Sequence, residues 1–99
     1  FVNGSSNGSA STTVVLGGGG NPSLRIASSP SGTNRFTGLI DEVRVTARAI
    51  YSSSFAPANR LAGVKDTKGL WRFDDQNVKD RADINNGTAG SQAFVTDVP

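Results

Sequence analysis

The sequence predicts an all-β protein, and three observations support that prediction. Short apolar runs are separated by clusters of Gly, Asn and Ser, the spacing typical of strands joined by tight connections. Asn-Gly pairs supply residues that readily adopt the positive φ of hairpin turns. The stretch FTGLIDEVRVTARAIY, from Phe36 to Tyr51, alternates apolar and polar side chains with the period of a strand.

The strand candidates follow one another with turn residues between them. The β-branched run TTVVL ends at four successive glycines, SLRIASS leads into the turn-forming SPSGTNR, and KGLWRFDD restores alternation after a loop that contains Pro57. The predicted strands therefore cover residues 12–16, 23–29, 36–50, 69–75 and 93–95.

Composition excludes several classes of function. The 99 residues include no Cys and no His, which removes disulfides, zinc-thiolate sites, thiolate nucleophiles and the commonest general base. The net charge of +2 comes from scattered residues, so we expect no nucleic-acid partner. No apolar run is long enough for a membrane span, and Phe1, which is not an initiator, suggests a piece of a longer polypeptide.

Asp41 stands out in the longest strand candidate. Strand alternation puts Asp41 on the same side as Leu39, Val43 and Val45, an apolar side. An ionised carboxylate there is costly without a partner, so we expect Asp41 to point inward and to be paired. The candidate partners are Arg72 or Arg35, which would make it structural, or a calcium ion.

Calcium needs six to eight oxygen ligands, and the stretch FDDQNVKDRADINNG is rich in them. Its spacing is not that of an EF-hand, and a solvated acidic loop beside Lys79 and Arg81 explains it equally well. The candidate oxygen donors in this stretch are Asp74, Asp75, Asp80, Asp83, Asn85 and Asn86. If calcium is bound as a structural ion, the predicted metal ligands are Asp41, Asp74, Asp80 and Asp83.

Three stretches resemble laminin G-like, concanavalin A-like jelly-roll domains. FTGLIDEVRVTARAIY is similar to their closing strand, with its aromatic-x-G-x-I-D-E-V-R-I pattern and RAL-like end. GLWRFDDQNVKDRADINNGTAGS resembles their opening strand, W-x-F-D-E, and the loop that ends in an N-x-G-T turn. FVNG matches their Y-V-N-G hairpin.

The resemblance implies an antiparallel β-sandwich, and this chain would be a fragment of a larger one. Residues 1–51 resemble the C-terminal half of such a sandwich, 52–68 a crossing loop, and 69–99 the opening-strand segment. Because the closing half comes first, the late strand either completes the same sheet in permuted order or begins a truncated second repeat. The first arrangement predicts that residues 36–50 and 69–75 pair as antiparallel neighbours.

The resemblance also implies a binding function. Related polysaccharide hydrolases carry an E-x-D-x-x-E triplet, which is absent here, and Asp41 and Glu42 lie on opposite faces of the strand, so we expect no enzyme activity. The predicted role is adhesion or recognition of glycans or surface proteins in an extracellular, cell-surface or virion-appendage protein. The alternative is a structural or assembly subunit whose edge strands pair with a neighbouring chain.

Aromatic residues and Asn-Gly pairs have plainer interpretations. Trp71 shares its parity with Phe73, so we expect it to pack in the core and not to stack on a sugar. Tyr51 and Phe55 are expected to pack and so pin the crossing loop. Three segments match the N-glycosylation acceptor pattern and are interpreted here as turns. They begin at Asn3, Asn7 and Asn86.

Overall fold

The computed structural model describes residues 1–11, 23–29, 31–74, 76–90 and 92–95. The chain forms two compact units, one made of Phe1–Asn7 with Ile40–Pro99 and the other of Gly8–Leu39. Within the described residues the regular structure is β, and no helix there is long and apolar enough to cross a membrane. The strand predicted at residues 12–16 lies outside the described residues.

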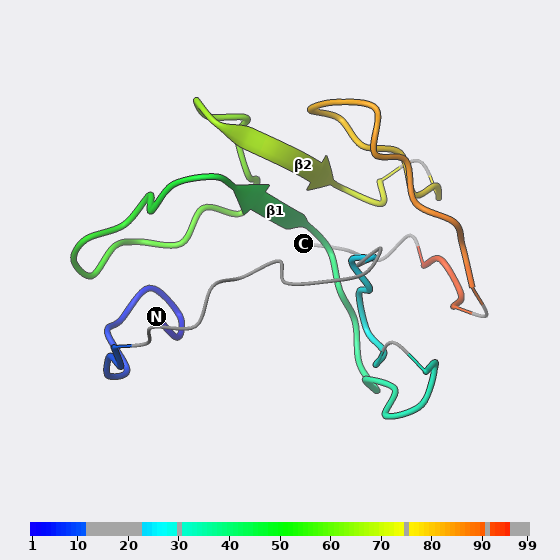
Figure 1. Cartoon of the computed structure of the whole chain (residues 1–99), viewed down its shortest axis with the longest axis horizontal. Coiled ribbons are helices and arrows are strands. Elements are labelled where there is room, and N and C mark those ends of the chain that lie inside the picture. Colours follow the sequence, from blue (N-terminus) through cyan, green and yellow to red (C-terminus); the bar gives the residue numbers. More distant parts are fainter. Residues whose placement is uncertain (12–22, 30, 75, 91, 96–99) are drawn as a thin grey trace. The chain divides into compact units, whose positions relative to one another are not determined.

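The first unit contains a two-stranded antiparallel sheet (Figure 1) of β1, Val43–Thr46, and β2, Thr67–Trp71. Val43 lies opposite Trp71, and Val45 lies opposite Gly69. This pairing confirms the predicted antiparallel contact between segments 36–50 and 69–75. The ladder is shorter than the alternating pattern suggested, because its register shifts between Val45 and Thr46 and Phe73 adopts a φ of 59° just beyond β2.

Trp71 is the main apolar group of this sheet. It is 8% exposed, which confirms the prediction that it is buried, and its cross-strand neighbour is Val43. The indole lies over Gly69 and donates a hydrogen bond of 3.1 Å from Nε1 to the carbonyl of Asn85. The adjacent Leu70 is also buried, so both faces of β2 are covered at its end.

The acidic segment after β2 covers the edge of β2 that β1 does not use. Asp80 bridges Trp71, and the Arg81 amide donates to the Leu70 carbonyl at 2.7 Å. The loop closes on itself where the Gly87 amide donates to the Val78 carbonyl at 2.8 Å. A segment predicted to be a loop thus supplies the third line of backbone pairing beside the two strands.

The N-terminal FVNG stretch forms the predicted hairpin turn. Asn3 and Gly4 both have positive φ, 50° and 79°, as the tight turns of hairpins require. Val2 and Ser5 exchange two backbone hydrogen bonds of 2.8 and 2.9 Å. The Gly4 carbonyl then accepts a hydrogen bond from the Phe55 amide at 2.9 Å, which fixes the turn against the loop that follows β1.

Two other predicted strands are wrong. Residues 23–29 are irregular, because Ala27 adopts a φ of 68° that interrupts an extended backbone. The Ser29 hydroxyl then donates to the Thr33 carbonyl at 2.7 Å and stabilises the predicted turn within the second unit. Residues 93–95 are described but form no strand.

Gly69 makes room for the indole, which gives a test of the packing. A Cβ at Gly69 would lie 2.3 Å from Cη2 of Trp71, and the indole is held in place by its bond to Asn85. We therefore expect Gly69→Ala to lower the free energy of unfolding by about 1–3 kcal/mol, measured by denaturant titration. Gly63→Ala is the matched control, because nothing lies within 4 Å of the position that a Cβ would take there. Equal stability of the two variants would contradict this packing.

Candidate functional site

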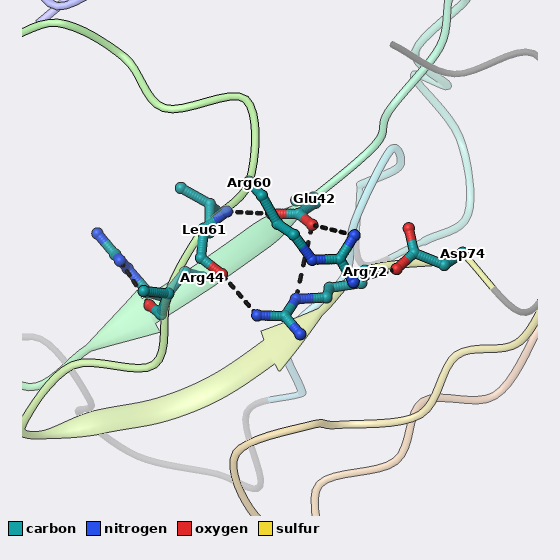
Figure 2. Close-up of polar contacts among 7 residues, drawn as sticks. Glu42, Arg44, Arg60, Leu61, Arg72 and Asp74 are labelled. Carbon is teal, nitrogen blue, oxygen red and sulfur yellow. Dashed lines mark hydrogen bonds and ion pairs between the residues drawn. The ribbon is translucent and has the colours of Figure 1, made fainter.

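A buried carboxylate lies on the face of the sheet opposite Trp71. Extending the register by one residue places Glu42 across from Arg72. The Glu42 side chain is 6% exposed, and its Oε1 lies 3.5 Å from Nε of Arg72 and 3.9 Å from Nη1 of Arg60. Its other oxygen accepts a hydrogen bond from the Leu61 amide (Figure 2). The carboxylate thus accepts one backbone hydrogen bond and lies within ion-pair distance of two guanidinium groups, while Nε of Arg72 makes no hydrogen bond in the described residues.

The same cluster holds the loop at residues 60–62 against both strands. Arg72 donates from Nη2 to the Leu61 carbonyl at 2.7 Å, and Arg44 donates from Nη1 to the Ala62 carbonyl at 2.8 Å. Arg60 reaches Asp74 at 2.6 Å. The hydrogen bond and charge of Asp74 raise the pKa of Arg60 above its usual value. Figure 2 shows these groups meeting between the strands and the loop.

The predicted pairing of Asp41 with Arg72 is wrong. Arg72, one of its two predicted arginine partners, pairs with Glu42 instead, and Asp41 takes part in none of the four ion pairs found in the described residues. The reason is geometric. Arg72 lies on the Leu70 face of β2, so its cross-strand neighbour has to come from the Glu42 face of the other strand.

Asp80 organises the loop that follows β2. Its buried carboxylate accepts hydrogen bonds from the amides of Leu70 and Ala82, both 2.9 Å, and of Asn85, 3.3 Å. Burial by itself acts to raise the pKa of Asp80, but these three backbone hydrogen bonds and one from the Asn85 side chain together outweigh it and hold the pKa below its usual value. Its own amide donates to Oδ1 of Asn86 at 2.9 Å.

The four predicted metal ligands do not form one ligand set. Asp80 is saturated by amide donors and Asp74 is paired with Arg60, while no group of three or more acidic side chains in the described residues is placed to hold a metal ion. Asp83 is exposed, Asp41 is half-buried, and Asp75 lies outside the described residues. Bound calcium stays a prediction that this donor geometry does not support.

An aromatic surface lies where the N-terminal hairpin meets the segment after β1. We use this name for Phe1, Tyr51 and Phe55. Tyr51 and Phe55 stack with centroids 3.5 Å apart and ring planes 6° apart, and Phe1 meets both rings edge-on at 6.5 and 5.5 Å. The expected packing of Tyr51 and Phe55 is confirmed, but Phe1 is 53% exposed and Tyr51 is 39% exposed.

Arg44 borders the aromatic surface. Its Nη2 donates to the Tyr51 hydroxyl at 3.3 Å, while its Nη1 is bonded to the Ala62 carbonyl. Sequence reasoning missed the contribution of Phe1, because its two ring partners lie some fifty positions away in the sequence. The resemblance of FVNG to a family hairpin was the available signal that this end of the protein is folded.

The structure is thus a β-sheet domain that carries a charged cluster on one face of its sheet and, elsewhere, an exposed aromatic surface. The family model described as the concanavalin A-like lectin/glucanases superfamily, Laminin_G_3, matches residues 1–54. That match spans more than half of the chain, so the chain belongs to this family and its fold is that of an antiparallel concanavalin A-like β-sandwich, of which the described residues form a part. Comparisons with curated proteins and with solved structures give no match.

Glu42 and Asp41 provide a direct comparison of neighbouring carboxylates. Glu42→Ala removes the partner of a partly buried guanidinium and of the Leu61 amide, so we expect it to lower the free energy of unfolding by about 3 kcal/mol. Asp41→Ala, the neighbouring comparison, is expected to lower it by clearly less, because Asp41 takes part in none of the ion pairs of the described residues. Denaturant titration of both variants measures the difference, and a larger loss at Asp41 would restore Asp41 as the paired carboxylate.

The lowered pKa of Asp80 predicts how the stability of the folded protein depends on pH. Because its pKa is lower in the folded protein than in the unfolded protein, its contribution is fully present above the unfolded value of about 4 and is lost as the pH falls through the folded value. Asp80→Asn replaces one acceptor oxygen by an amide and should lack this component. Melting temperatures from neutral pH downward measure it, and parallel curves for the two proteins would contradict the role given to Asp80.

Proposed function

We propose that this domain is a non-catalytic recognition module of an extracellular or surface-exposed protein, and that it binds glycans or surface proteins through the aromatic surface. Family membership supports a binding role, and the exposed aromatic surface is the observation that carries the proposal. Aromatic rings combine a large apolar area with low conformational freedom, which suits them to contact the apolar faces of sugars or side chains of a protein partner.

Arg44 adds polar recognition to this surface. Its two hydrogen bonds in the described residues go to neutral oxygens, a carbonyl and a phenol, and none of the ion pairs there involves it. Its positive charge is therefore not neutralised by a carboxylate of the described residues and can attract a ligand oxygen. A ring platform with a guanidinium beside it offers both stacking area and a hydrogen-bond donor.

The environment of the carboxylates supports a non-catalytic role. A glycosidase needs two carboxyl groups that flank one bond and are able to exchange protons. Here Glu42 is engaged by Arg72, Arg60 and the Leu61 amide, and Asp80 is engaged by three backbone amides. These interactions favour a structural role for both carboxylates.

A second candidate function is assembly with another polypeptide through β1. The amide and carbonyl of Leu70 point away from β1, since they bond to Asp80 and Arg81. Arg44, paired opposite Leu70, must then direct its own amide and carbonyl away from β2 as well. No backbone hydrogen bond within the described residues uses them, and such an edge can accept a strand from a partner.

Binding by the aromatic surface can be tested with variants of its exposed rings. We expect Tyr51→Ala and Phe1→Ala each to weaken retention on a glycan array, or on immobilised surface proteins, by about tenfold or more. Ile84→Ala is the control, since Ile84 is 87% exposed and lies outside the aromatic surface. Circular dichroism checks that the variants fold.

The two candidate functions give different results in the same experiment. Binding that is lost in Tyr51→Ala and Phe1→Ala but kept in Ile84→Ala supports the recognition module. Equal binding by all three variants, together with self-association in sedimentation that none of them weakens, would contradict it and favour assembly through β1.

A further inference from the structure

The sequence contains three Asn-Gly pairs, and each can undergo spontaneous deamidation of its asparagine without any ligand. The backbone nitrogen of the glycine can attack Cγ of the preceding asparagine, forming a new bond to Cγ while the bond from Cγ to Nδ2 breaks and ammonia leaves. Water then opens the resulting succinimide to aspartate or isoaspartate. The reaction needs a free glycine N–H and an asparagine side group that can rotate onto it, so local structure decides which pair reacts. The asparagines concerned are Asn3, Asn7 and Asn86.

Both reacting groups of the Asn86-Gly87 pair are held. The Gly87 amide, the nucleophile, donates to the Val78 carbonyl at 2.8 Å. The Asn86 side chain accepts the Asp80 amide through Oδ1 at 2.9 Å, and the Asn86 amide donates to the Ile84 carbonyl at 2.9 Å. Attack therefore requires at least two of these hydrogen bonds to open first.

The Asn3-Gly4 pair is restrained in a different way. It forms the centre of a closed turn, flanked by the two hydrogen bonds between Val2 and Ser5. Gly4 is buried, and a Cβ there would lie 1.9 Å from the Phe55 carbonyl oxygen, so this backbone has little space to change conformation. The turn holds the peptide, although the Asn3 side chain is exposed.

The Asn7-Gly8 pair has neither restraint. Both residues are exposed, and nothing lies within 4 Å of the position where a Gly8 Cβ would be. None of the hydrogen bonds found in the described residues involves the Asn7 side chain or the Gly8 amide. The Gly8 nitrogen and Cγ of Asn7 can therefore approach each other without first breaking a hydrogen bond of the described residues.

We propose that Asn7 is the site at which this protein is modified by spontaneous deamidation, and that the fold protects Asn86 from the same reaction. Protection of Asn86 preserves the Asp80 loop, since the Asn86 side chain accepts the Asp80 amide and modification would introduce a new charge at that bond. Modification at Asn7 places the new charge on an exposed segment, away from the hydrogen bonds that hold the sheet.

Peptide mapping by mass spectrometry tests this proposal. The folded protein is incubated in mildly alkaline buffer, and conversion of each asparagine is followed with time. We expect Asn7 to convert at least about tenfold faster than Asn86, the factor that two hydrogen bonds are able to supply, with Asn3 between them. Gly8→Ala should slow conversion at Asn7 by crowding the attacking nitrogen.

A parallel incubation in guanidinium chloride separates the fold from the local sequence. In the unfolded protein the three rates should converge, because each pair then has the same Asn-Gly chemistry. Conversion of Asn86 as fast as Asn7 in the folded protein would overturn the proposal, as would a ratio of rates that is unchanged by unfolding.

Discussion

The pairing of Val43 with Trp71 sets the positions of the groups on the two faces of the two-stranded sheet. It places the indole over Gly69 on one face, where it is buried and hydrogen-bonded to Asn85. On the other face the same register sets Glu42 opposite Arg72. A shift of one residue would exchange the two faces, and it would expose the indole and bury an unpaired charge. Apolar packing and charge pairing thus depend on the same alignment of the two strands.

Side chains and loops supply hydrogen bonds that the two short strands do not make with each other. The Asp80 carboxylate bonds to the free edge of β2 and to its own loop, so one side chain supplies acceptors for three backbone amides. The loop at residues 60–62 is held in a similar way by Arg44 and Arg72 from the other two segments. Charged groups in this domain therefore satisfy backbone hydrogen bonds that further strands would otherwise satisfy.

Much of this arrangement could be predicted from local sequence. Asn3-Gly4 specifies a hairpin turn, Trp71 is a large apolar residue in an alternating stretch, and the resemblance of the two strand motifs indicated that they pair. The Asp41 assignment failed because parity identifies which side chains share a face but not which residue of the other strand lies opposite them. Phe1 was missed because its neighbours Tyr51 and Phe55 are distant in sequence. Register and long-range contacts are tertiary properties, and single-strand periodicity does not contain them.

The register can be measured most directly by a double-mutant cycle between the two strands. Glu42 and Arg72 are replaced singly and together, and the coupling energy is obtained from three denaturant titrations against the parent protein. The account predicts a coupling of about 1 kcal/mol or more for this pair, and a coupling near zero for Asp41 with Arg72. Coupling of Arg72 to Asp41 instead of Glu42 would contradict the register and, with it, the placement of the buried indole and the charged cluster on opposite faces.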